Sequence, residues 1–197
     1  MIDQAAVLAS ALIALVPAAA REERAPFVTD LSRAIVSASA EATCSGPWAE
    51  VPDCRRTWPG TPLELQAVVG TLGFWESGFL PRIQAGECKK WGPRKQDIEC
   101  DGHVLLEGRT VFKAATTFQI QGLTLEQRRE AVGLGEIQLY EASRHAVRVV
   151  AGHRERCYVS NWATCVFTGL AGTLVFRQAG ARARTFQVVL ERMRAAR

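Results

Sequence analysis

A helix that should begin at Thr61 constrains this chain more than any other segment. Thr61 is a suitable N-cap, Pro62 suits the first helical position, and Glu64 can complete a capping box. The residues that follow make a broad apolar stripe: Leu65, Val68, Val69, Leu72 and Trp75. Such a stripe predicts that the helix packs against the rest of the domain. Gly78 should end the helix, which places Glu76 at the far end of a buried element.

The same periodicity extends through most of the chain and predicts an all-α fold. Apolar residues recur at helical spacing in further segments, at about residues 5–15, 26–38, 124–133, 136–152, 161–170 and 186–193. Residues 80–113 lack this spacing and are expected to be irregular. The predicted organisation is an N-terminal helix within residues 1–24, packed on one domain formed by residues 25–197.

Two glycines, Gly70 and Gly73, lie inside the predicted helix that carries Glu76. Each costs a helix interior about 1 kcal/mol relative to alanine, so we expect another backbone to come close at these positions. Burial disfavours the charged form of a carboxyl group, and we therefore expect apolar surroundings to hold Glu76 neutral. A neutral carboxyl is what a general acid for glycoside cleavage requires. The alternative is an ordinary solvent-facing glutamate at a helix end.

The cysteines are even in number and form pairs that are close in sequence. The pairs are Cys44 with Cys54, Cys88 with Cys100, and Cys157 with Cys165. Short local loops of this kind are typical of disulfides formed outside the cytosol, although sequence alone does not fix the connectivity. Buried free thiols are one alternative. A zinc site is the other, but Cys88, Cys100 and His103 lack the short paired spacing of a zinc knuckle.

Charge and motifs limit the classes of partner. The formal net charge of +4 favours approach to anionic polymers without selecting one. Arginines gather near the C-terminus, yet no nucleic-acid-binding motif accompanies them. We expect no nucleic-acid partner, and a DNA-binding helical domain is kept only as a distant alternative. No Walker motif, HExxH sequence, dinucleotide fingerprint or nucleophile elbow is present, so neither a cofactor nor a metal is expected.

Residues 5–20 are apolar, but they match neither a signal peptide nor a membrane span. The preceding residues include Asp3 and no positive charge, unlike a secretion signal. The run is short for a membrane span and is broken by Pro17. We expect a helix on the domain surface, with Leu8, Leu12 and Leu15 on its inner face.

The segment from Leu65 to Phe79, LQAVVGTLGFWESGF, resembles the catalytic helix of the soluble lytic transglycosylase and goose-type lysozyme branch of the lysozyme superfamily. Its Glu-Ser-Gly-Phe ending matches the family motif. A second family block is similar to residues 114–120, which keep an aromatic-Gln-Ile ending but lack the usual glycines. A third block, commonly Ala-x-Tyr-Asn-x-Gly, falls at residues 165–172, where the tyrosine is missing. The resemblance covers about residues 61–172.

The resemblance implies a lysozyme-like helical domain with a disulfide-stapled loop insertion. It implies cleavage of the MurNAc–GlcNAc β-1,4 bond of peptidoglycan glycan strands, with Glu76 as the catalytic general acid and base. It also implies a sugar-binding cleft lined by Ser77, Thr117, Phe118 and Gln119. Tyr140 is the candidate replacement for the missing tyrosine, and the alternative is a core tyrosine with a bonded hydroxyl.

Two chemical outcomes stay open. A lytic transglycosylase needs one acid, because the substrate's own 6-hydroxyl closes a 1,6-anhydro ring. A muramidase needs a second carboxylate to position water, and the candidates are Asp97, Glu99 and Asp101, which are otherwise solvated loop charges. Trp75 either lines the saccharide groove or packs in the core.

The alternative function is a catalytically inactive lysozyme-fold protein that binds or supports the cell wall. Disulfides favour an exported location, in the periplasm or outside the cell, and the weak N-terminal signal favours a virion or a secretion machine. Association with a larger wall-penetrating assembly is the corresponding expectation for partners.

Overall fold

The structure is a computed structural model of the whole chain. The parts of the chain that it describes are residues 2–91, 97–99, 104–106, 109–111, 116–120, 123–158, 160–170 and 176–196.

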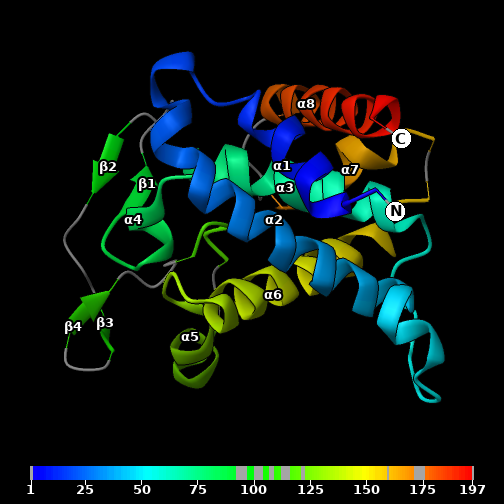
Figure 1. Cartoon of the computed structure of the whole chain (residues 1–197), viewed down its shortest axis with the longest axis horizontal. Helices are drawn as coiled ribbons and strands as arrows, with labels where there is room; N and C mark the ends of the chain where they lie inside the picture. The colour runs from blue at the N-terminus through cyan, green and yellow to red at the C-terminus, as the bar shows by residue number, and fades with distance from the viewer. Residues whose placement is uncertain are drawn as a thin grey trace.

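The described residues are mainly helical, which confirms the predicted fold class (Figure 1). The α-helices are α1 (Gln4–Ile13), α2 (Arg21–Thr43), α3 (Pro62–Ser77), α4 (Pro81–Gln84), α5 (Leu125–Ala131), α6 (Glu136–Arg154), α7 (Trp162–Leu170) and α8 (Phe176–Ala195). Two short 3-10 helices, η1 (Ala18–Ala20) and η2 (Gly46–Glu50), flank α2. None of the helices in the described ranges is both long and apolar enough to cross a membrane.

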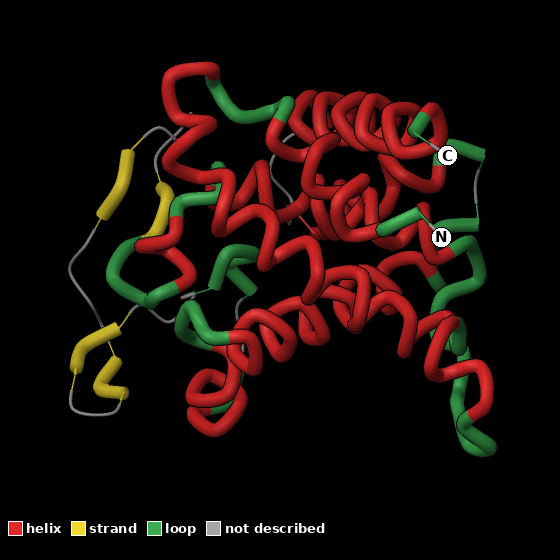
Figure 2. The backbone as a smooth tube through the Cα atoms, viewed as in Figure 1, coloured by secondary structure: helices red, strands yellow, loops and turns green. Residues whose placement is uncertain are grey.

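The segment expected to be irregular contains short antiparallel strand pairs. Strand β1 (Lys89–Trp91) pairs with β2 (Asp97–Glu99), and β3 (Val104–Leu106) pairs with β4 (Arg109–Val111). In register, Lys90 faces Ile98 and Leu105 faces Thr110. Figure 2 shows these strands at one side of the helical body. Period-2 alternation over three residues is too short to detect in a sequence, so these hairpins were not predicted.

Helix α3 lies at the centre of the fold and contacts α1, α2, α6 and α8. Its stripe is buried as predicted: Leu65, Val68 and Val69 are fully inaccessible to solvent. The helix ends at Gly78, whose left-handed conformation has φ 61° and whose N–H donates to Phe74 O. The sequence signals at both ends of α3 therefore place Glu76 in its last turn.

The N-terminal helix α1 packs against α2, α3 and α8, with Leu8 and Leu12 fully buried. A Cβ atom at Gly70 would lie 2.9 Å from Leu12 Cδ1. The lack of a side chain at Gly70 thus makes room for the side chain of Leu12. The sequence had predicted that another backbone would come close at this position. Helix α2 also differs from expectation, because it begins at Arg21 and carries Pro26 in its interior.

Disulfides close two of the local loops as predicted. Cys44 bonds to Cys54 and joins the end of α2 to the loop after η2, while Cys157 bonds to Cys165 and ties α6 to α7. Cys88 is disulfide-bonded as well. Its predicted partner, Cys100, lies outside the described residues.

The capping box at the start of α3 yields a stability prediction. Glu64 N donates to Thr61 Oγ1 (3.2 Å), and Thr61 N donates to Glu64 Oε2 (2.7 Å). Thr61→Ala removes the acceptor for the Glu64 N–H and should lower the free energy of unfolding by about 1 kcal/mol. Thr61→Ser keeps the hydroxyl and should unfold at nearly the wild-type urea concentration. Equal stability of the alanine and serine variants would show that the cap contributes little.

Candidate functional site

Glu76 forms an ion pair with an arginine from the other end of the chain. Its Oε1 lies 2.6 Å from Nη1 of Arg182 on α8. The Arg182 side chain is 1% exposed and that of Glu76 is 12% exposed. The carboxylate therefore lies at the edge of the interior beside a buried cation. This corrects the expectation of purely apolar surroundings that would hold Glu76 neutral.

The buried guanidinium of Arg182 makes few polar contacts in the described part of the chain. Its guanidinium carbon lies 5.7 Å from the ring centroid of Trp75. Its Nε is buried and has no hydrogen-bond partner in the described part of the chain. A buried charge is costly unless it is paired. Among the described residues, Glu76 is the acidic group that pairs with Arg182 and offsets its charge. The ion pair fastens the last turn of α3 to α8.

Trp75 takes part in the same contact between α3 and α8. Its indole N–H donates to Thr185 Oγ1 at 3.2 Å, and the Thr185 hydroxyl donates to Ala181 O at 3.1 Å. Trp75 is half-buried and bonded within the protein, which corresponds to the packing alternative for this residue. Its position orients the end of α3 against α8.

Ser77 does not reach solvent. It is 0% exposed, its hydroxyl donates to Gly73 O at 2.8 Å, and Phe79 N donates to the same hydroxyl at 3.1 Å. The resemblance placed Ser77 in a cleft, and the structure corrects this: the serine closes the C-terminal turn of α3. Phe79, with a φ of 58°, then turns the chain away from the helix.

The second segment of the resemblance lies directly against α3. The side-chain amide of Gln119 donates to the backbone carbonyl of Glu76. A Cβ at Gly73 would lie 3.1 Å from Thr117 Cγ2 and 3.2 Å from Phe118 Cε1. Residues separated by some forty positions in the sequence thus meet at the end of one helix, and Gly73 is what permits the close approach.

Burial limits what two residues of this segment can do. Thr117 is 0% exposed and Phe118 is 2% exposed, so both belong to the core and not to a surface that a saccharide could touch. Gln119 is half-buried and has a φ of 47°. Of the predicted cleft residues, Gln119 is the one that accompanies Glu76 at the edge of the interior.

A buried glutamine that the sequence did not single out holds this segment in place. Gln84 Oε1 accepts the N–H of Thr117 at 2.8 Å. Gln84 Nε2 donates to Ala131 O at 2.8 Å and to Gly133 O at 2.9 Å. Gln84 is 0% exposed on the four-residue helix α4. Nothing in the local sequence distinguishes this glutamine from a surface residue.

Tyr140 lies in a different contact, between α2 and α6. Its hydroxyl donates to Glu41 Oε2 at 2.8 Å, and Arg144 Nε lies 3.3 Å from the same oxygen. Burial, followed by the hydrogen bond to Glu41, raises the pKa of Tyr140 to about 12. Tyr140 also lines a hollow of about 550 Å³, together with Arg33 and Ile137. The bonded hydroxyl corresponds to the alternative given for this tyrosine, and its acceptor is Glu41 and not Glu76.

The candidates for a second carboxylate are not placed by the structure. Asp97 and Glu99 belong to β2, where the backbone alone is described, and Asp101 lies outside the described residues. The predicted choice between hydrolysis and transglycosylation therefore stays a prediction.

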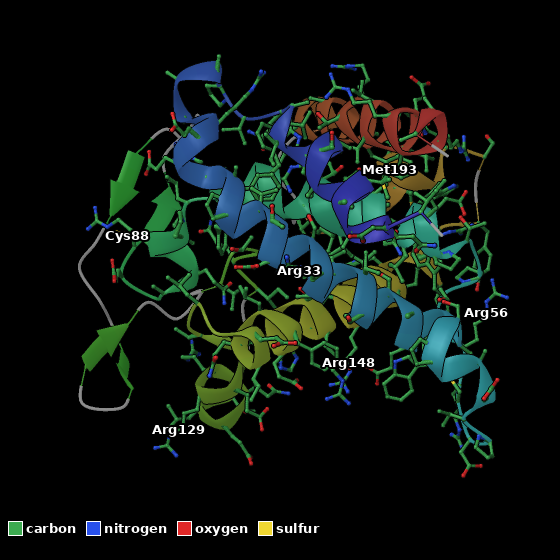
Figure 3. All side chains as sticks on the ribbon, in the orientation of Figure 1. Arg33, Arg56, Cys88, Arg129, Arg148 and Met193 are labelled. Atoms are coloured by element: carbon green, nitrogen blue, oxygen red, sulfur yellow. A yellow bond between two sulfur atoms is a disulfide. The ribbon has the colours of Figure 1, made fainter. Side chains whose placement is uncertain are left out.

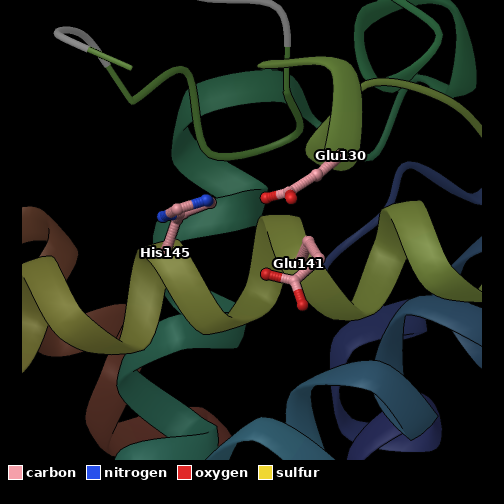
Figure 4. A group of neighbouring side chains, drawn as sticks. All are labelled: Glu130, Glu141 and His145. Atoms are coloured by element: carbon pink, nitrogen blue, oxygen red, sulfur yellow. The ribbon is translucent and has the colours of Figure 1, made fainter. Parts of the chain in front are cut away.

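A second cluster of functional groups, which the sequence analysis missed, lies between α5 and α6 (Figure 4). Glu130 comes from α5, and Glu141 and His145 come from α6; one ligand atom of each lies within 4.8 Å of those of the other two. Burial, aided by Arg148 and opposed by Glu141, lowers the pKa of His145 and favours the neutral imidazole. The spacing of Glu141 and His145, one helical turn apart, was the available signal.

Comparisons with known proteins add no relative: no family model matches the chain, and neither does any curated protein or solved structure.

Proposed function

We propose that the chain is a peptidoglycan-cleaving glycosidase in which Glu76 transfers the proton. The observation that carries the proposal is the contact between Gln119 and the backbone of Glu76. The two segments that resemble the family motifs meet there, and the packing of Gly73 against Thr117 and Phe118 supports the same arrangement. A glutamate at the edge of the interior, 12% exposed, has the position that a general acid needs.

The proposed reaction uses one carboxyl group twice. Glu76 is paired with Arg182 in the free protein, so the proposal requires it to take up a proton when the glycan binds. In that protonated form, Glu76 donates its proton to the oxygen that bridges MurNAc and GlcNAc, and the bond from that oxygen to the anomeric carbon breaks. The 6-hydroxyl of MurNAc then attacks the anomeric carbon and returns its proton to Glu76, which yields a 1,6-anhydro product. A water molecule in place of the 6-hydroxyl would give a hydrolytic product.

Arg182 acts in this scheme as a positioning residue. Its guanidinium contacts Glu76 Oε1 at 2.6 Å and fixes the direction of the carboxyl group. Trp75 supports the same geometry from α3 through its hydrogen bond to Thr185. A carboxyl held within a narrow range of orientations transfers protons more effectively than a mobile one.

One observation favours the second candidate function, a catalytically inactive wall-binding or structural protein. The pairing of Glu76 with a buried cation satisfies the carboxylate within the protein. In that role the ion pair would serve only to join α3 to α8.

The cysteines support the proposed setting. Disulfides at Cys44–Cys54 and Cys157–Cys165 are compatible with an exported protein. The finer proposal is a periplasmic, extracellular or virion location, where the protein meets glycan strands as part of a larger wall-penetrating assembly.

Sedimentation of peptidoglycan separates the two candidate functions. Purified insoluble peptidoglycan is incubated with the folded protein and then pelleted, and both the protein and the released sugar are measured in the supernatant. The proposal expects soluble muropeptides to accumulate with time. Protein retained on the pellet without released sugar would support the inactive wall-binding protein and contradict the glycosidase.

A further inference from the structure

We propose that Glu130, Glu141 and His145 form a binding site for one divalent transition-metal ion, and that Zn²⁺ fits it best. The three side chains bring their ligand atoms within 4.8 Å of one another across the packed pair α5 and α6. This site is separate from Glu76, and the inference does not depend on the proposed glycosidase activity.

The arrangement of the cluster follows from the helices that carry it. Glu141 and His145 are one turn apart on α6, so their side chains project from the same face. Glu130 lies in the last turns of α5 and extends toward that face, and the edge of the imidazole points toward its carboxylate (Figure 4). Two packed helices thus fix the backbone positions of the three candidate ligands.

The imidazole gives an independent indication of a ligand. His145 is 6% exposed, and its Nε2 is buried with no hydrogen-bond partner in the described part of the chain. A buried nitrogen without a hydrogen-bond partner is destabilising, and coordination to a metal would satisfy it. Two carboxylates beside it supply the negative charge that a divalent ion requires.

The charges around the cluster leave Glu141 able to coordinate. Arg144 Nη1 lies 3.4 Å from both oxygens of Glu141, but Arg144 also pairs with Glu41 through Nε at 3.3 Å. Arg148 is the other nearby cation, and it extends from α6 into solvent (Figure 3). The long, shared contact from Arg144 is weak enough for a metal to compete with it.

The ligand types select the ion. One imidazole nitrogen and two carboxylate oxygens suit Zn²⁺, whereas Ca²⁺ and Mg²⁺ prefer oxygen donors throughout. Ligands about 2.0–2.2 Å from Zn²⁺ are about 3.3 Å apart in a tetrahedral shell, so the donors must approach one another. Glu130 is exposed and free to make that movement. Three protein ligands leave the fourth position for water.

The test is a calorimetric titration of Zn²⁺ into the untagged full chain, after treatment with a chelator and dialysis under oxidising conditions. Oxidising conditions keep the disulfide cysteines from offering thiolates. We expect one Zn²⁺ per chain. Glu130→Gln, at an exposed position that leaves the core intact, should weaken the affinity at least 10-fold.

Two control variants make the result specific. Glu126→Gln changes another exposed glutamate of α5, and His153→Gln changes a histidine of α6 that contacts Arg156 instead. Both should keep the wild-type affinity. An absence of saturable Zn²⁺ binding would overturn the proposal, as would equal affinity of Glu130→Gln and Glu126→Gln, or a loss of binding in His153→Gln alone.

Discussion

Glu76→Gln is expected to lower the free energy of unfolding by about 3–5 kcal/mol, because it leaves the guanidinium of Arg182 buried without a charged partner among the described residues. Arg182 is 1% exposed, its contact with Glu76 Oε1 is 2.6 Å long, and its Nε has no hydrogen-bond partner in the described residues. Urea denaturation followed by circular dichroism measures the change. The expected loss is large because the cost arises from the uncompensated cation and exceeds the value of the pair itself.

A double variant separates the cost of an unpaired Arg182 from the stability that the ion pair itself contributes. Glu76→Gln combined with Arg182→Met removes both charges and keeps an apolar side chain of similar length on α8. Since replacing a buried ion pair by well-packed apolar groups is often neutral or stabilising, the double variant should regain most of the stability lost by the single one. A single variant as stable as the wild type would contradict the ion-pair account.

The second large effect concerns activity. In the stable Glu76→Gln/Arg182→Met protein, release of soluble muropeptides should fall at least about 100-fold, because general acid–base catalysis contributes about 10²–10⁴ to a rate. The amide of glutamine offers no acidic proton to the bridging oxygen. The rate is measured on the same peptidoglycan preparation, at equal protein concentration.

Glu64→Gln is the control for a glutamate-to-glutamine change on α3, and it leaves Arg182 in place. It changes a glutamate at the opposite end of the same helix, where glutamine also completes a capping box. Its rate should equal that of the wild type. A double variant that releases fragments as fast as Glu64→Gln would leave Glu76 with a structural role alone.

Sequence signals between neighbouring residues predicted the helices around the site. The burial and the pairing of the site residues depend on contacts between distant segments, which the sequence did not predict. The capping box at Thr61 and the stop at Gly78 depend on neighbouring residues, so the bounds of α3 were readable from the sequence. The sequence predicts too late a start for α2, because the first turn of this helix is charged and carries no apolar repeat before Pro26. The burial of Ser77 and Phe118 depends on segments that are distant in the chain, and no local pattern reveals it.

The ion pair was missed although a signal for it existed. Arg182 is one of the arginines that gather near the C-terminus. It falls at helical spacing with large buried residues of α8, among them Phe186, Val189 and Met193. A cation on the apolar face of a helix requires a buried partner, so this phase predicts that an acidic residue lies opposite it. The identity of that partner, Glu76, depends on how α3 and α8 pack.

The cluster of Glu130, Glu141 and His145 shows the same difference between local and long-range contacts. Glu141 and His145 share one face of α6, which the sequence shows directly. Glu130 joins them because α5 packs beside α6, and this placement is set by the intervening turn and the buried core. Pairs within one helix are thus predictable from spacing, whereas the third ligand requires the fold.

Mass analysis of the soluble fragments tests the account most directly. Purified peptidoglycan is digested with the wild type and, in parallel, with the folded Glu76→Gln/Arg182→Met protein. The account predicts disaccharide-peptides with 1,6-anhydro-muramyl or reducing ends from the wild type and a near absence of both from the double variant. No fragments from folded wild type, or identical fragments from both proteins, would contradict the claim that this chain cleaves glycan strands through Glu76.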